Sequence, residues 1–145
     1  MKITKFDHAF LLVEESSQQL VIDPGSYSPE LPKLENVVGI VLTHLHDDHS
    51  YLPHIKAIQS QFPQVKIYGP QDVAAKLGEI SCEVVSHGSH LKVGSFQLDF
   101  FGECRDSKAR DTQRKRFGYT ALPVTGSKRS ETASVFSSAR VKSIA

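Results

Sequence analysis

The stretch "VVGIVLTHLHDDHS", residues 37–50, decides how the rest of this sequence is interpreted. Its first half is a continuous run of apolar, mostly β-branched residues, which is typical of a strand covered on both faces of a sheet. Its second half places three histidines and two aspartates in the loop that follows. In α/β enzymes, catalytic groups lie in such loops, where a buried strand ends. The stretch therefore predicts a buried strand that leads into a polar site.

The residue types in this loop indicate metal binding. His44 and His46 are two positions apart, so on an extended backbone their side chains lie on the same side and can share one metal ion. Asp48 and His49 follow in the turn, where the chain can fold them toward a second metal beside the first. Imidazole and carboxylate suit Zn²⁺, Fe²⁺ or Mn²⁺, and the lack of thiolate argues against a purely structural zinc site. A histidine-rich surface loop is the alternative, but residue type, spacing and the preceding strand all argue against it.

The segments around this loop alternate between strand and helix signals, which predicts an α/β fold with helices on the face of a sheet. We expect strands over residues 2–6, 9–15, 18–25, 65–69, 82–86 and 95–102. We expect helices over residues 50–62 and 70–79, and a link over residues 87–94. In the first helix, Ser50 is the expected cap and Pro53 suits the first turn.

Length and composition fit one domain of a soluble cytoplasmic protein. The chain has 145 residues and a formal net charge of +1, and it has no apolar run near the length of a membrane span. Its first residues lack the cleavage site of a signal peptide. Cys82 and Cys104 make no disulfide framework, which suits a reducing compartment.

The composition changes abruptly near residue 105. Residues 1–104 contain 7 Lys and no Arg against 13 Asp and Glu, a balance of −6, whereas residues 105–145 contain 10 Lys and Arg against 3 acidic residues, a balance of +7. The strand and helix pattern also fails after Gly102, and "FGYTALPV", residues 117–124, is the one later stretch that resembles a strand. We therefore expect a domain over residues 1–103 and a basic, serine-rich tail over 104–145 that is poorly ordered.

The loop carries a specific family resemblance. His-x-His-x-Asp-His resembles the signature of the metallo-β-lactamase superfamily, and His44, His46, Asp48 and His49 match it position by position. The resemblance implies a four-layer αββα sandwich with two metal ions, of which His44 and His46 would bind the first and Asp48 and His49 the second. It further implies a metal-activated hydroxide that attacks a carbonyl or phosphorus ester, with Asp48 as the catalytic residue that orients it.

Two further motifs extend this resemblance over residues 1–103. "VIDPG", residues 21–25, is similar to the aspartate turn of the superfamily. The similarity implies that Asp23 supports the segment over residues 43–50, which we call the metal loop. A plain turn residue before Pro-Gly is the alternative for Asp23. The opening "MKITKFDHAFLLVEE" looks like that of the small lactonase-like hydrolases, where a histidine at the position of His8 is common. His8 is thus either a second supporting residue or a partly buried strand histidine.

The chain departs from the family pattern after residue 103. The family supplies a third histidine, a Pro-Gly-Asp turn and a late histidine, but here no histidine follows His90 and no Pro-Gly-Asp occurs. The resemblance therefore covers only the N-terminal αβ half, whose inner sheet face would lack its partner. Related hydrolases continue at this point with Ala-Val-Ile and then Pro-Glu-Ile. Residues 104–107 and 109–112 can be encoded by codons that give these two sequences when the DNA is translated one base later. This predicts a reading-frame shift near Glu103.

The remaining candidates and alternatives are weaker. We interpret His54, His87 and His90 as ordinary histidines, and Cys104 as a free cysteine and not a substitute ligand. The predicted function is a zinc-dependent hydrolase of a small molecule, truncated and impaired in this chain; iron or manganese also fits the ligands. The alternatives are a non-catalytic metal binder and a basic-tail protein that binds nucleic acid, although interleaved aromatic residues are scarce. We expect no membrane association, and an uncovered sheet face would favour self-association.

Overall fold

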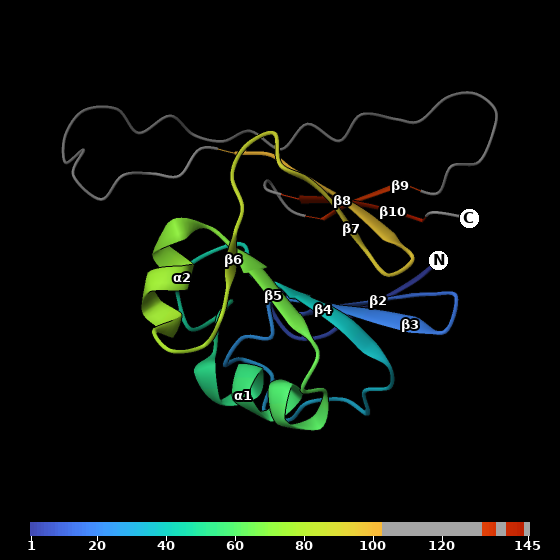
Figure 1. Ribbon diagram of the computed structural model, residues 1–145. Coiled ribbons are helices and arrows are strands. Elements are labelled where there is room, and N and C mark those ends of the chain that lie inside the picture. The colour runs from blue at the N-terminus through green and yellow to red at the C-terminus, as the bar shows by residue number, and fades with distance from the viewer. Residues whose placement is uncertain (103–131, 136–138, 144–145) are drawn as a thin grey trace.

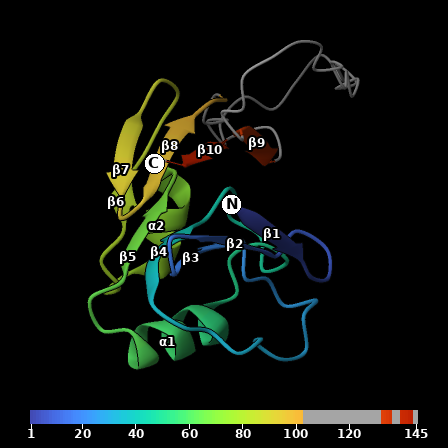
Figure 2. The ribbon, with the colours of Figure 1, turned by 90° about the vertical axis from the view of Figure 1, so that its right-hand side faces the viewer.

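The computed structural model describes residues 1–102, 132–135 and 139–143. In that part of the chain two sheets face each other, and two helices lie against the outer face of the larger sheet (Figure 1). A view turned by 90° shows the same three layers, with α1 below the larger sheet and the smaller sheet above it (Figure 2). These layers correspond to three of the four that the resemblance implies.

The larger sheet has six strands in the order of the chain. They are β1 (Lys2–Lys5), β2 (Leu11–Glu15), β3 (Gln18–Ile22), β4 (Val37–Val41), β5 (Lys66–Gly69) and β6 (Glu83–Val84). The first three pair antiparallel, whereas β3 to β6 run parallel to one another. Ser16 and Ser17 both have positive φ, as a two-residue hairpin turn between twisted strands requires. The predicted strands in this region are confirmed.

The two helices are α1 (Leu52–Gln61) and α2 (Gln71–Leu77). Ile55 and Ile58 of α1 are fully buried in a core shared with the outer face of the larger sheet. Pro53 lies in the first turn of α1, as predicted. The prediction that Ser50 caps this helix is wrong. The cap position belongs to Tyr51, and the Ser50 hydroxyl donates hydrogen bonds to carbonyl groups within the metal loop instead.

The smaller sheet is antiparallel, with the order β7-β8-β10-β9. Its strands are β7 (His90–Val93), β8 (Phe96–Phe100), β9 (Thr132–Val135) and β10 (Ala139–Ser143). β8 was predicted, but the expected link over 87–94 contains β7. Two short segments of the tail, β9 and β10, also form strands, which the sequence did not predict. The stretch over 117–124 lies outside the described residues.

The two sheets share a second core. Leu20 and Ile22 of the larger sheet meet Phe96 and Leu98 of the smaller one, and all four are fully buried. Val141 of β10 belongs to the same core and is also fully buried. The inner face of the larger sheet is therefore covered, and the expectation that it lacks a partner is corrected.

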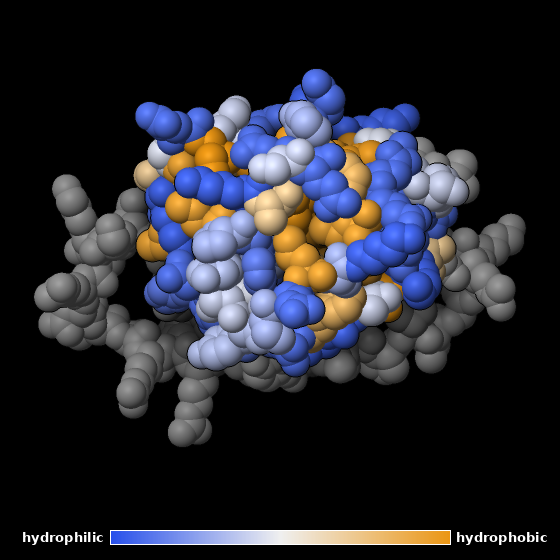
Figure 3. All heavy atoms as spheres, turned by 90° about the horizontal axis from the view of Figure 1, so that it is seen from below, coloured by the Kyte–Doolittle hydropathy of each residue, from blue (hydrophilic) through white to orange (hydrophobic). Residues whose placement is uncertain are grey.

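The surface of the described residues combines polar and apolar areas. On the side where α1 lies, hydrophobic residues gather near the centre of the face, with hydrophilic residues around them (Figure 3). Within the described ranges, no helix has both the length and the hydropathy that a membrane crossing requires.

Candidate metal centre

The parallel strands β3 and β4 end side by side, and the loops that follow them build the site. Ile22 pairs with Val41, so Asp23 and the metal loop leave the sheet at the same edge. The buried Asp23 carboxylate accepts hydrogen bonds from the backbone N–H of Thr43 at 2.7 Å and from its hydroxyl at 2.5 Å. The structure thus places Asp23 directly against the start of the metal loop.

His44 and His46 lie side by side in this loop, as their spacing predicts. Nε2 of His44 is 2.8 Å from Nδ1 of His46, and the ring centroids are 4.7 Å apart. The His44 ring also stacks on His49, with centroids 4.3 Å apart and an interplanar angle of 18°. The three imidazoles of the signature therefore form one continuous cluster.

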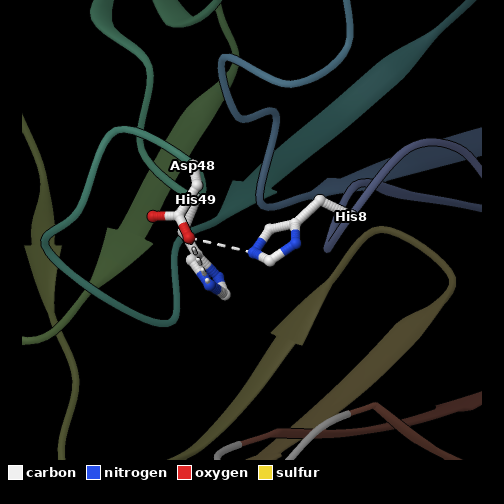
Figure 4. Close-up of side chains that lie close together, drawn as sticks. All are labelled: His8, Asp48 and His49. Carbon is white, nitrogen blue, oxygen red and sulfur yellow. Dashed lines mark ion pairs between the residues drawn. The ribbon is translucent and has the colours of Figure 1, made fainter.

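Asp48 and His49 come together with a third residue, His8 (Figure 4). Oδ2 of Asp48 lies 2.9 Å from Nε2 of His8 and 3.8 Å from Nε2 of His49. One ligand atom from each of the three residues lies within 4.8 Å of the others. His8 is in the loop between β1 and β2, at φ 54°, and its side chain is 44% exposed. The alternative interpretation of His8 as a partly buried strand histidine is therefore wrong.

Asp23 determines which nitrogen of His49 is available. Oδ2 of Asp23 lies 2.9 Å from Nδ1 of His49. Because an ionised carboxylate only accepts hydrogen bonds, Nδ1 of His49 carries the proton and donates it. In the neutral ring, Nε2 then has a free lone pair on the side of Asp48. A metal-binding histidine almost always donates its other ring N–H to a carboxylate, a backbone carbonyl group or water, and Asp23 is such a partner for His49.

The electrostatics of the cluster shift the pKa values of three of its side chains, and two of the shifts favour the form that binds a metal. Burial lowers the pKa of His44, and the neighbouring His49 lowers it further, so His44 is neutral. The hydrogen bond that His49 donates to Asp23 raises the pKa of His49 against the opposing effect of burial, which favours its protonated form. Burial raises the pKa of Asp48, but His49, a backbone hydrogen bond and His8 together outweigh it and lower the pKa, so Asp48 is ionised.

Lys76 of α2 holds the loop from the other side, and sequence reasoning missed it. Its Nζ donates to the carbonyl oxygen of Leu45 at 2.8 Å, to Oδ1 of Asp47 at 2.6 Å, and to the carbonyl oxygen and hydroxyl of Ser50 at 3.0 and 3.1 Å. The four acceptors all belong to the metal loop. No local pattern marks this lysine, because the contact depends on how α2 packs beside the end of β4.

Gly25 allows the Asp-Pro-Gly turn to touch the metal loop. A Cβ at this position would lie 1.7 Å from the carbonyl oxygen of Asp48, which is far inside van der Waals contact. The adjacent Ser26 N–H donates to the carbonyl oxygen of Asp47 at 2.9 Å. The motif over 21–25 therefore contributes both a carboxylate and a close backbone approach.

The remaining histidines lie apart from this cluster. His54 is buried in α1 with its ring against Tyr51, and His87 is exposed. His90 places Nδ1 2.9 Å from Oδ1 of Asp99 on the smaller sheet. Cys104 lies outside the described residues.

The fold and the loop together define a class of protein. A sheet pair with helices on one outer face, and a His-x-His-x-Asp-His loop after a parallel strand, are the features of a metallo-β-lactamase fold. A family model described as "Beta-lactamase superfamily domain" matches residues 2–127. The chain therefore belongs to the β-lactamase superfamily, and the predicted family and fold class are confirmed. The match also extends past the boundary expected at residue 103.

Curated relatives align with much of this chain but with less of themselves. Protein Rv0786c of Mycobacterium tuberculosis is 29% identical over 104 residues, which are 72% of this chain and 49% of that protein. Hydroxyacylglutathione hydrolase of Yersinia enterocolitica is 33% identical over 92 residues, which are 61% of this chain and 35% of that enzyme. The chain thus spans half or less of the length of these relatives.

Solved structures share the fold at low sequence identity. A protein of Parabacteroides distasonis assigned to the metal-dependent hydrolases matches with a TM-score of 0.58 and 23% identity, over 68% of this chain and 44% of that chain. The metallo-β-lactamase fold protein YhfI of Bacillus subtilis matches with a TM-score of 0.51 and 18% identity, over 63% of this chain and 43% of that chain. These similarities support the fold alone.

Proposed function

We propose that this chain carries the metal centre of a metal-dependent hydrolase that acts on a small molecule. His44 and His46 bind one metal ion in this proposal, and Asp48 and His49 bind a second. The observation that carries it is the gathering of all four side chains of the signature at the end of β4. Membership of the β-lactamase superfamily supports the same assignment.

The donor set fits a first-row divalent metal. Three imidazoles and one carboxylate are the ligands that Zn²⁺, Fe²⁺ and Mn²⁺ prefer. Asp23 orients His49 from behind, as the outer partner of a metal-binding histidine does. We propose zinc as the metal, with two ions in a complete family member.

The reaction class follows from this chemistry. A metal ion in the site supplies Lewis acidity, which lowers the pKa of bound water and polarises a carbonyl or phosphoryl oxygen. Asp48 is ionised and its side chain is 29% exposed, so it can orient the attacking water and accept its proton. The Yersinia relative is by name a hydrolase of hydroxyacylglutathione. For this chain we propose a small carbonyl or phosphorus ester, thioesters and lactones included.

Hydrolysis by the full chain tests this proposal. The chain is loaded with zinc, iron or manganese and assayed against a lactone, a thioester and a phosphodiester, beside the Asp48→Asn variant. We expect hydrolysis of one class that chelation abolishes and that Asp48→Asn lowers by at least about a hundredfold. Bound metal without hydrolysis of any of the three classes contradicts the proposal and identifies a non-catalytic metal-binding protein.

We place the protein in a reducing cytoplasm. Within the described residues Cys82 is a free thiol, and burial, together with Glu83, raises its pKa to about 11. Such a thiol stays protonated and is neither a nucleophile nor a ready disulfide partner.

A further inference from the structure

Three metal-capable side chains from two separate loops meet at one edge of the molecule. His8 comes from the loop between β1 and β2, whereas Asp48 and His49 come from the loop after β4 (Figure 4). We propose that His8 is a direct metal ligand, and that His8, Asp48 and His49 form a three-donor site for one divalent cation. This inference rests on the proposed function and changes the role of His8 from supporting residue to ligand.

The distances fit a tetrahedral ion. Zinc bonds of about 2.0–2.2 Å at tetrahedral angles separate neighbouring donor atoms by about 3.3 Å. Oδ2 of Asp48 lies 2.9 Å from Nε2 of His8 and 3.8 Å from Nε2 of His49, on either side of that value. The three donor atoms all lie within 4.8 Å of one another.

The alternative explanation is that His8 only hydrogen-bonds Asp48. Oδ2 of Asp48, however, faces two imidazole Nε2 atoms at once. A single cation satisfies that oxygen and both nitrogens together, whereas a plain ion pair uses only His8.

The three-donor site has an open side. The His8 side chain is 44% exposed and that of Asp48 is 29% exposed. A surface hollow of about 400 Å³ adjoins the site and is lined by Asp7, His8 and Tyr27. The Tyr27 ring lies 5.0 Å from the His8 ring, so it flanks the same hollow. Three protein donors with a fourth position open to solvent are typical of a catalytic metal and not of a structural one.

Zinc binding by the double variant His44→Ala/His46→Ala isolates the proposed site. In this full-length background only His8, Asp48 and His49 of the cluster remain. We expect one zinc ion per chain, and zinc X-ray absorption that shows two imidazole ligands. Adding His8→Gln leaves one imidazole and weakens zinc binding by at least about tenfold. The matched control is His87→Gln in the same background, because His87 is an exposed histidine outside the cluster.

The outcomes separate this inference from the proposed function. A double variant that binds no zinc, or one that shows a single imidazole ligand, overturns the role of His8 while binding by the unmodified chain still supports the hydrolase. An unmodified chain that binds no zinc overturns both. If the variants do not fold, the imidazole ¹⁵N spectrum of the unmodified chain decides, because coordination shifts Nε2 of His8 upon zinc addition. An unshifted His8 resonance overturns the inference.

Discussion

At the scale of single residues, the site depends on a carboxylate that touches no metal in the proposal. Asp23 is 2% exposed, has a φ of 48°, and accepts hydrogen bonds from the Thr43 backbone, the Thr43 hydroxyl and His49. Aspartate tolerates this left-handed backbone conformation better than most residues. Two residues later, Gly25 has no side chain, so the turn can contact the metal loop. A short motif thus fixes both the loop and the tautomer of a histidine.

Replacement of Asp23 by asparagine tests this role. The Asp23→Asn side chain keeps its size but loses its charge, so it orients His49 less firmly and lowers its basicity. We expect zinc affinity to fall by about ten- to a hundredfold, measured by competition with a chromophoric chelator. Asp99→Asn is the matched control, since Asp99 is also buried and bonded to a histidine but lies on the other sheet. Equal zinc affinities of Asp23→Asn and the unmodified chain contradict this role.

The residue pattern predicted the members of the cluster because type and spacing are local properties. His44 and His46 lie on the same side of an extended chain, and Asp23 was identified by the Asp-Pro-Gly motif in which it lies. The proximity of His8 to Asp48 arises from the pairing of β1 with β2, so sequence spacing could not reveal its 2.9 Å contact. Lys76 was not predicted either, because its contacts also depend on how separate elements pack together.

At the scale of secondary-structure elements, α2 positions the metal loop through Lys76. The Lys76 side chain is 25% exposed, and its ammonium group shares its three N–H donors among four acceptors between Leu45 and Ser50. Hydrogen bonds of a charged donor stabilise more than neutral ones, so their loss should weaken the attachment of the loop to α2. Helix α2 therefore helps to fix the position of the metal loop.

The variant Lys76→Met tests this role because it keeps the aliphatic stem and removes the charge. We expect the free energy of unfolding to fall by about 1–3 kcal/mol and zinc affinity to fall with it. Lys56→Met on the exposed side of α1 is the control. Urea unfolding and chelator competition measure both quantities. Should Lys76→Met and Lys56→Met behave alike, α2 does not position the loop.

Strand β8 carries a buried carboxylate whose effect depends on pH. The hydrogen bond from His90 and the ammonium of Lys142 lower the pKa of Asp99 to about 2, against the effect of burial. Because the folded pKa lies below the unfolded value of about 3.9, the pairing stabilises the fold above that pH and is lost as the pH falls toward 2. Two of the three strands involved, β7 and β10, were not predicted, since each is short and mixes polar with apolar residues.

Asp99→Asn therefore has a pH-dependent effect on stability. We expect the variant to be less stable than the unmodified chain at neutral pH, and the difference to shrink between about pH 4 and pH 2. Urea unfolding as a function of pH measures this difference. A gap that stays constant down to the lowest pH shows that the ionised carboxylate is not what stabilises the fold.

At the scale of the whole molecule, the covering of the larger sheet is the main departure from the sequence prediction. The serine-rich tail gave no clear apolar periodicity, yet β10 pairs with β8 and puts Val141 into the core between the sheets. The strands of residues 1–102 were predictable because their apolar patterns are strong. The pairing of β10 was not, because one buried valine carries little local signal. The reading-frame shift near Glu103 stays a prediction that sequencing of the coding DNA checks.

Val141→Asp tests whether the tail strand covers the core. Val141 is fully buried, so the variant places an unpaired charge among apolar side chains and should cost more than about 3 kcal/mol of unfolding free energy. Val84→Asp is the control, because Val84 of β6 is 48% exposed and its replacement should stay within about 0.5 kcal/mol. If Val141→Asp lowers the unfolding free energy no more than Val84→Asp does, β10 does not cover the core of the larger sheet.

All of these proposals require that the loop over residues 43–50 holds a metal ion. Equilibrium dialysis of the full chain against zinc, followed by measurement of bound zinc per chain, tests it most directly. The reference is a variant that lacks all four predicted ligands, in which alanine replaces His44, His46, Asp48 and His49. We expect at least one tightly bound ion in the unmodified chain and none in the variant. Equal zinc in both proteins would contradict it.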